Sequence, residues 1–421
     1  MTSSLCVIDS MNAKSKRPEL RALTGLRFFA AFYVVIVHTF LFSNREGLER
    51  FIQWLPSQLT NFLDRGYVSV NLFFVLSGFI LTYGYSLPSG AISVSRSTFW
   101  MARVARIWPV YLLGFLCAAP VVLRAKYIDN PGSLTNFGFL GSALANLALV
   151  QNWIPVIGSW NPPAWSLSTE ACFYLLFPFL LPRMAGLRTK TLWLLLVTLY
   201  GLSLLPPTLL SMRWSYTDHL YDLAKNPVGV TWHQAILYNP WLRLPEFLIG
   251  AATGILFLRH RQEGASRRGG AFLSYFATIG ILVALACLSK VPWPVLMAGG
   301  LTPLFCLLIY ALAKEESVLQ RFLSAPLIVL LGQASYAIYI LHWPIMQYIE
   351  LLLLRLHVQV NPEWAVLLHG GLTTICVVPL SILVFWYIEE PARKRIRAWM
   401  PKVARTATSL PPLARTAIIE Q

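Results

Sequence analysis

Long apolar runs, each interrupted by only a few polar residues, recur along the whole chain. Ten of them reach the length of roughly 17 to 25 residues that a helix needs to cross a bilayer. We predict the spans at 23–43, 67–86, 107–123, 165–182, 191–210, 241–258, 272–289, 295–313, 327–350 and 364–388. The first run is preceded by polar residues and followed by no small-residue cleavage site, so it is a retained span rather than a signal peptide. The pattern therefore predicts an all-α, polytopic membrane bundle.

Lysine and arginine are distributed unevenly over the segments that connect these runs. With the N-terminus in the cytoplasm, ten crossings put more than twice as many Lys and Arg in cytoplasmic segments as in external loops. An eleventh, weaker apolar run at 137–151 contains Asn146, and counting it as a crossing would move the basic loops 183–190 and 259–270 outside. We therefore expect ten spans with both termini cytoplasmic, and a re-entrant or external segment at 137–151 that packs on protein or lines a cavity.

Composition agrees with a membrane protein and excludes other classes. The 421 residues are 56% hydrophobic and only 12% charged, whereas about a quarter of the residues in a soluble domain are charged. The formal charge of +16 does not indicate nucleic-acid binding, because the basic residues lie in short loops where they fix orientation. The six cysteines have no metal-ligand spacing, and no Walker A, GxGxxG or HExxH pattern is present. We therefore expect no nucleic-acid partner and no metal.

The chain divides into three parts by composition. Residues 1–18 form a polar N-terminal segment that we expect to be disordered, and 19–393 form the membrane domain. Residues 394–421 are basic and rich in Pro, Ala and Thr, which is typical of a disordered tail.

Five ionisable residues fall at a similar depth in the outer half of the predicted spans. They are His38, Glu170, Arg243, Glu246 and His342. Ionisable groups are costly in lipid, so we expect these five to converge on a shared polar cavity. A carboxylate beside a histidine orients the imidazole and stabilises the imidazolium during general-base catalysis. We predict that Glu170 pairs with His38 in this way; the alternative is that the five groups only hold helices together.

A second polar cluster is expected at the cytoplasmic side. Arg27 lies eleven residues before His38, so the two share one face of the first helix and are about 16 Å apart along its axis. Arg103 and Arg106 precede the third span and share a face if that segment is helical. With Arg27 they could grip an anionic phosphate group. On their own, such arginines favour a role in orientation and lipid headgroup contact.

Seven stretches of the chain, taken in order, resemble the type-3 acyltransferase family of integral-membrane O-acyltransferases, which act on surface glycans, nodulation factors or macrolides. The stretches are ELRALTGLRFFAAFYVVIVH, VSVNLFFVLSGFIL, RVARIWPVY, WSLSTEACFY, RLPEFLIG, SYAIYILHWP and YIEEPARK. The resemblance implies an acyl-coenzyme A donor, usually acetyl-coenzyme A, used from the cytoplasmic side, and a hydroxyl acceptor, often on a glycan. It also implies that Arg27 and His38 are essential and that Arg103 and Arg106 assist donor binding.

The sequence therefore predicts a multi-pass O-acyltransferase of the bacterial inner membrane. In this hypothesis His38 removes the proton of an acceptor hydroxyl, which attacks the thioester, and Glu170 orients His38. The acceptor site would be shaped, or the oxyanion stabilised, by Arg243, Glu246 and His342. Two alternatives remain open: a transporter or flippase that binds a glycan or small anionic substrate without chemistry, and a structural subunit of an envelope complex.

Overall fold

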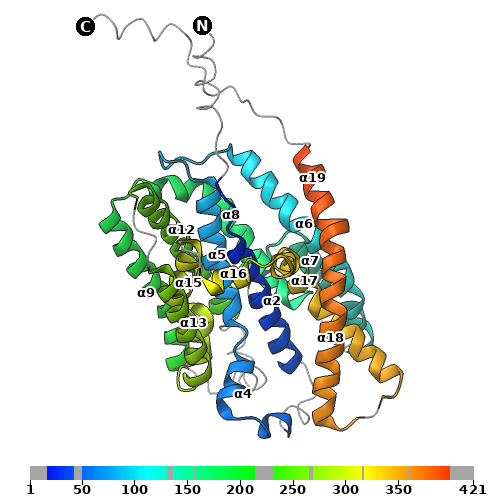
Figure 1. Cartoon of the computed structure of the whole chain (residues 1–421). Helices are drawn as coiled ribbons and strands as arrows, with labels where there is room; N and C mark the ends of the chain where they lie inside the picture. The colour runs from blue at the N-terminus through cyan, green and yellow to red at the C-terminus, as the bar shows by residue number, and fades with distance from the viewer. Residues whose placement is uncertain are drawn as a thin grey trace, which may run out of the picture.

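The computed structural model describes residues 17–41, 50–129, 136–154, 157–213, 232, 234–264, 269–314, 317–358 and 360–398. Within these ranges ten helical segments are long and apolar enough to cross a membrane, which confirms the predicted number of spans. This part of the chain contains no strand beyond an isolated bridge between Ser86 and Ile92. The protein is therefore a polytopic helical bundle (Figure 1).

The membrane-spanning segments are built from long helices, two of them extended by shorter ones. They are α2 (Arg21–Leu41), α5 (Val68–Tyr85), α6 (Arg96–Arg124), α8 (Trp165–Ala185), α9 (Thr189–Arg213), α12 (Pro240–Gln262), α13 (Gly270–Cys287), α14 (Trp293–Val295) with α15 (Thr302–Lys314), α17 (Pro326–Arg355), and α18 (Pro362–Val384) with α19 (Glu390–Ala398). Shorter elements connect or extend them: α4 (Ser57–Asp64), η1 (Ala125–Asp129), α7 (Asn136–Leu147), η2 (Gln151–Trp153), η3 (Pro162–Ala164), η4 (Leu296–Gly300), α16 (Val318–Leu323) and η5 (Phe385–Glu389).

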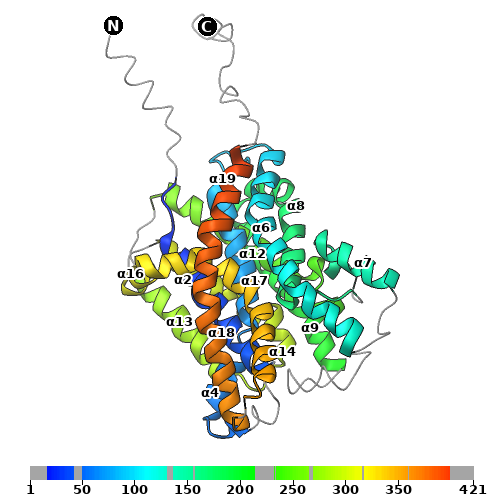
Figure 2. The same cartoon turned by 90° about the vertical axis from the view of Figure 1, so that its right-hand side faces the viewer.

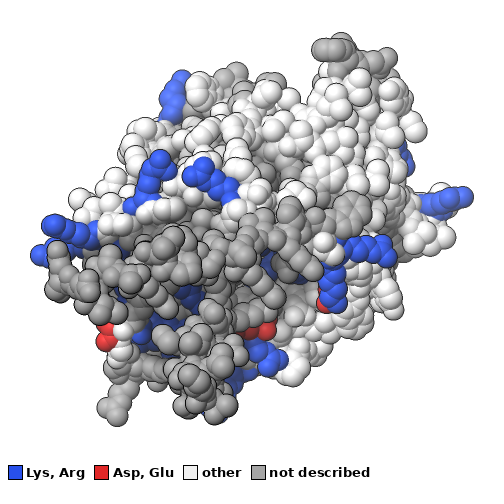
Figure 3. All heavy atoms as spheres, turned by 90° about the horizontal axis from the view of Figure 1, so that it is seen from above, with Lys and Arg blue, Asp and Glu red and all other residues white. Residues whose placement is uncertain are grey.

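The start of α2 and the end of α19 lie at the same end of the bundle, as an even number of crossings requires (Figure 1). Figure 3 views this face, and Lys and Arg side chains are spread over it with few Asp or Glu. The distribution agrees with the predicted orientation, since basic residues collect on the cytoplasmic side of membrane proteins. We therefore refer to this face as the cytoplasmic end.

Close helix contacts at which only glycine fits include one between α12 and α5 and one between α17 and α2. A Cβ added to Gly250 of α12 would stand 1.9 Å from the carbonyl oxygen of Val75 in α5. A Cβ added to Gly332 of α17 would stand 2.0 Å from the carbonyl oxygen of Thr24 in α2. Small residues permit this kind of backbone approach between membrane helices. The second contact places α2 beside α17, and both helices carry predicted site residues.

Helix α6 begins eleven residues before the predicted third span, at Arg96. Ser95 caps it, since its hydroxyl accepts a hydrogen bond from the Thr98 amide at 3.2 Å. The first turns of this helix are polar, so the apolar pattern of the sequence does not mark them. Arg103 and Arg106 therefore lie on a helix, three residues apart, which meets the condition for a shared face.

At the other end of the chain, η5 joins α18 to α19 and the helix continues to Ala398. Residues 394–398 of the expected disordered tail are therefore helical. The rest of that tail, and residues 1–16 of the expected N-terminal segment, lie outside the described residues.

The weak apolar run at 137–151 does not cross the bundle. Its helix, α7, lies at the flank (Figure 2), and η2 and η3 lead back towards α8. Asn146 holds this return in place, because its Oδ1 accepts from the Trp160 amide and its Nδ2 donates to the Gly158 carbonyl, both at 3.0 Å. Tyr111 of α6 donates to the Asn146 carbonyl. The segment thus packs on protein, as predicted for a re-entrant or external segment.

Candidate functional site

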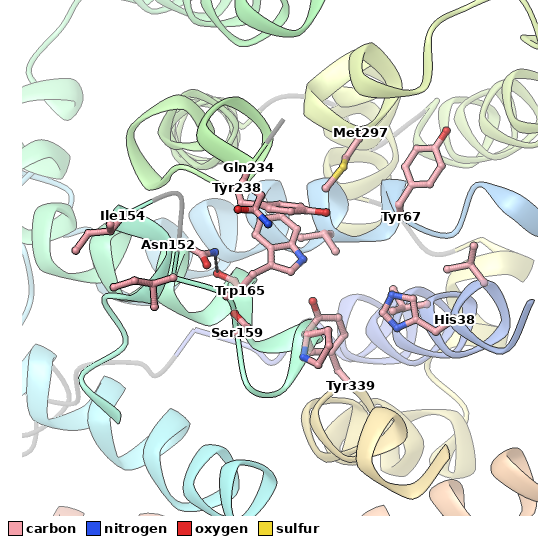
Figure 4. A pocket seen from close by; sticks show the side chains of 16 residues that line it. His38, Tyr67, Asn152, Ile154, Ser159, Trp165, Gln234, Tyr238, Met297 and Tyr339 are labelled. Carbon is pink, nitrogen blue, oxygen red and sulfur yellow. Dashed lines mark hydrogen bonds between the residues drawn. The ribbon is translucent and has the colours of Figure 1, made fainter. Parts of the chain in front are cut away.

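A cavity of about 370 Å³ lies beside His38, between α2, α5, the return segment 151–164, the turn before α12, and α17 (Figure 4). Aromatic rings supply much of its wall, with Trp165, Tyr238 and Tyr339 among the lining residues. Segments more than a hundred residues apart in the chain therefore meet around the predicted catalytic histidine. This is the size and composition expected of a small-molecule site.

His38 contacts His342 of α17 at the edge of this cavity. Nδ1 of His38 is 2.6 Å from Nε2 of His342, and Nδ1 of His342 is 3.3 Å from the carbonyl oxygen of Ile338. A carbonyl oxygen only accepts, so Nδ1 of His342 carries the proton, and in the neutral ring Nε2 accepts. Nδ1 of His38 therefore donates to His342, and Nε2 is the nitrogen of His38 that holds the lone pair.

Glu170 is not brought to His38, contrary to the predicted pairing. Its carboxylate hydrogen-bonds with Tyr174 and interacts electrostatically with Arg27, Arg106 and Arg103. Glu170 therefore belongs to the arginine cluster. The position beside His38 that was predicted for Glu170 is occupied by His342.

The physical reason is the depth at which α8 begins. The prediction placed the start of this span at the outer surface, but the return segment carries the chain back into the bundle first. Just before α8, the Pro163 carbonyl accepts a hydrogen bond from the Tyr339 hydroxyl at 3.0 Å, and Tyr339 lies one turn inward of His342 on α17. Five residues of helix beyond Trp165 then carry Glu170 roughly 8 Å further towards the cytoplasmic end.

The three predicted donor-binding arginines do meet in one cluster. Arg27 interacts electrostatically with Arg106 and with Glu170, and Glu170 interacts in turn with Arg103. Arg106 forms an ion pair with Glu389 of η5, whose side chain is fully buried. No role was predicted for Glu389 from the sequence, although the residue lies within the stretch YIEEPARK.

Arg103 is held by aromatic groups and keeps an unused donor. Its Nη2 donates to the Tyr85 hydroxyl at 3.2 Å, and its guanidinium carbon lies 5.8 Å from the centre of the Tyr174 ring. Its Nε is buried and has no partner among the described residues. Guanidinium groups outnumber carboxylates in the cluster, so it suits an anion such as a phosphate group.

The cavity and the arginine cluster are separate. None of Arg27, Arg103 and Arg106 lines the cavity. Arg27 and His38 lie on one face of α2, about 16 Å apart along the helix, as the sequence predicted. One helix thus connects the arginine cluster with the His38 imidazole.

Arg243, Glu246 and His342, which were predicted to shape the acceptor site, do not line the cavity either. Arg243 Nη1 lies 3.0 Å from Glu246 Oε1, and both side chains are fully buried. Arg243 also donates to the Met297 carbonyl at 2.9 Å and lies 5.9 Å from the ring of Trp165. Met297 and Trp165 line the cavity, so this ion pair supports the wall from behind.

Sequence reasoning missed the uncharged polar residues of the cavity, namely Asn152, Ser159 and Gln234. Asn152 also fixes the wall, since its Nδ2 donates to the Trp165 carbonyl at 2.8 Å. Asn152 and Ser159 lie in the segment before α8, and Gln234 lies in the helical turn before α12, outside the predicted spans. The available signal was the concentration of amide and aromatic side chains in QNW and WNPPAW, next to the predicted re-entrant run. Among the residues that the structure describes, no group of His, Cys, Asp and Glu has the arrangement of a metal site.

Comparisons with known proteins give consistent findings. The family model described as an acyltransferase domain, Acyl_transf_3, matches residues 20–387. The acyltransferase MdmB of Streptomyces mycarofaciens is 28% identical over 337 residues, which are 78% of this chain and 79% of that protein.

Two relatives are longer than this chain. The peptidoglycan O-acetyltransferase OatA of Listeria monocytogenes is 28% identical over 349 residues, 78% of this chain and 51% of OatA. The putative peptidoglycan O-acetyltransferase YrhL of Bacillus subtilis is 26% identical over 395 residues, 88% of this chain and 54% of YrhL. The chain thus spans about half the length of these two relatives. No solved structure matches it.

Proposed function

This chain belongs to the type-3 acyltransferase family, and from that premise we propose that it moves an acetyl group from acetyl-coenzyme A to a hydroxyl of a surface glycan or lipid-linked saccharide. It is a multi-pass membrane acyltransferase. The relatives OatA and YrhL, an O-acetyltransferase and a putative one, favour acetyl as the acyl group and oxygen as the acceptor atom. We place the enzyme in the bacterial inner membrane, where cytoplasmic acetyl-coenzyme A reaches its arginine cluster.

The hydrogen bond between His38 and His342 at the cavity is the observation that carries this proposal. Nε2 of His38 takes the proton of the acceptor hydroxyl while the oxygen attacks the thioester carbonyl. The carbon–sulfur bond then breaks, the new ester leaves, and the proton on His38 passes to the coenzyme A thiolate. His342 holds the imidazole of His38 in the tautomer that this sequence of steps needs, as the third group of a catalytic triad does.

At the cytoplasmic end, Arg27 and Arg103 are the residues that we propose to bind the phosphate groups of the donor. Arg106 is already neutralised by Glu389, so we assign it a positioning role within the cluster. Glu170, beside Arg27 and Tyr174, keeps the Arg27 guanidinium oriented. The roughly 16 Å between Arg27 and His38 along α2 then separates donor phosphates from the reacting carbonyl.

The test follows labelled acetyl transfer in membranes that contain the protein. Wild-type membranes supplied with [14C]acetyl-coenzyme A should gain label in base-labile esters, and His38→Gln should lower the rate by about 100-fold or more. His369→Gln is the matched control, because His369 is also a buried membrane histidine, bonded to the Met346 carbonyl at 3.0 Å. A His38→Gln protein that inserts normally and keeps full transfer would refute the proposal. A transporter would move substrate without forming labelled ester at all.

A further inference from the structure

We infer that the cavity beside His38 is an acceptor site for an uncharged, hydroxylated ring, and that it rejects a ring carrying a carboxylate. The inference rests on the proposed function for the reaction, but the binding it predicts can be measured without acyl transfer. The predicted acceptor residues lie behind the wall, so the selectivity must come from the side chains that face the cavity.

The absence of formal charge in the lining is the first argument. The described residues around the cavity include no Asp, Glu, Lys or Arg, and His38 is the only one that can gain a charge near neutral pH. The nearest ion pair, between Arg243 and Glu246, is internally compensated and fully buried. A carboxylate moved into such a cavity would lose its hydration and find no Lys or Arg as a counter-ion among the described lining residues, which is costly.

The kind of polar group that remains is the second argument. Asn152, Ser159 and Gln234 face the cavity with amide and hydroxyl groups, which pair with hydroxyls as both donors and acceptors (Figure 4). The Ser159 hydroxyl is buried and has no partner among the described residues. Buried polar groups are nearly always hydrogen-bonded, so an unpaired hydroxyl at a cavity wall indicates a partner supplied by a ligand.

The aromatic wall is the third argument. The rings of Trp165 and Tyr238 lie with their centres 4.6 Å apart, and Tyr339 faces the same cavity. Tyr339 is held in place by hydrogen bonds to the Pro163 carbonyl at 3.0 Å and from the Ser166 hydroxyl at 2.9 Å. Rigid aromatic faces combined with a few hydrogen-bonding groups suit the apolar C–H face and polar rim of a cyclic polyol.

A pair of probes that differ in one group tests the charge selectivity. Methyl β-D-glucopyranoside and methyl β-D-glucuronide share the ring and differ only by hydroxymethyl against carboxylate at C6. Saturation-transfer NMR on the full chain in nanodiscs should show transfer to the glucoside and at least about fivefold weaker transfer to the glucuronide. Equal transfer to both probes, or none to the glucoside, would overturn the inference.

Variants show whether the signal comes from this cavity. Gln234→Leu keeps the size of the side chain and should weaken glucoside binding about fivefold, the value of one hydrogen bond. Trp165→Leu should weaken it as much or more, while Trp241→Leu, an exposed tryptophan outside the lining, should leave it unchanged. If Trp165→Leu does not fold, Gln234→Leu alone decides. Unchanged binding in Gln234→Leu would overturn the inference.

Competition separates the acceptor from the uncharged arm of the donor. Pantetheine that displaces the glucoside competitively would assign the cavity to the donor and overturn the inference. Failure of the proposed function looks different: the wild-type protein would bind the glucoside with the predicted selectivity, yet transfer no acetyl group to any acceptor.

Discussion

Replacing His342 by leucine should lower turnover strongly and leave donor binding nearly unchanged. The substitution removes the acceptor that lies 2.6 Å from Nδ1 of His38. In the proposed mechanism the His38 imidazole becomes positively charged, and a hydrogen bond to a charged group contributes about 1.5 to 3 kcal/mol. At 1.4 kcal/mol per factor of ten, kcat should fall roughly 10- to 150-fold. His342 has no place in the arginine cluster, so KM for acetyl-coenzyme A should change by less than about threefold.

A second substitution distinguishes orientation from packing. His342→Gln restores an amide oxygen near the position of Nε2, so it should recover part of the activity that His342→Leu loses. If His342 only filled space in the interior of the bundle, the leucine variant would be at least as active as the glutamine variant. Steady-state acetyl transfer by purified protein in liposomes gives kcat and KM for each variant, with His369→Leu as the control for loss of a buried histidine.

Two outcomes would refute this reasoning. One is a His342→Leu enzyme with wild-type kcat, since the tautomer of His38 would then need no help from α17. The other is a larger loss in His342→Gln than in His342→Leu, with both proteins folded, because the proposed role depends on a hydrogen-bond acceptor at that position.

Three further predictions concern the donor cluster and the packing of the bundle. Arg103→Gln should raise KM for acetyl-coenzyme A about tenfold with a smaller change in kcat, because one charge-assisted phosphate contact is lost; the liposome assay measures both. Arg243→Met leaves the buried Glu246 carboxylate uncompensated and should destabilise the protein by about 3 to 5 kcal/mol. The loss should appear as a lower unfolding temperature in detergent. The double variant Arg243→Met with Glu246→Leu should recover most of the lost stability. Gly250→Ala should cost about 1 to 3 kcal/mol by overpacking α5 against α12, whereas Gly201→Ala, with no atom within 4 Å of the new Cβ, should raise stability by up to about 1 kcal/mol.

The membrane architecture was predictable because it depends on quantities that a sequence displays directly. The length of an apolar run and the position of basic residues fix the number and orientation of spans, and Asn146 together with the charge count excluded an eleventh crossing. The helix that carries Arg103 was predicted too short for the same reason. Hydropathy marks where a helix lies in lipid, while the start of α6 is set by the Ser95 cap beyond it.

The part of the site that lies on a single helix followed most directly from the sequence. Arg27 and His38 share a face because helical geometry fixes the angle between residues eleven apart. The depth of Glu170 was predicted wrongly because it depends on the depth in the bundle at which the return segment ends and α8 begins. A hydrogen bond from Tyr339, far away in sequence, to the Pro163 carbonyl helps to fix that depth. Gln234 carries no charge and lies in the helical turn before the predicted span 241–258, so neither hydropathy nor charge marked it.

The residues between the two ends of the α2 face give the proposed reaction its order. Ala31 and Val34 lie on that face between Arg27 and His38, and both are buried. Val34 lines the cavity, while the cavity does not extend to Arg27. Packed side chains therefore lie between the arginine cluster and the cavity, and in the proposed mechanism the thioester has to pass them to reach His38. In the proposed mechanism the thioester therefore meets His38 only beside the cavity, which favours transfer to a bound acceptor hydroxyl over hydrolysis.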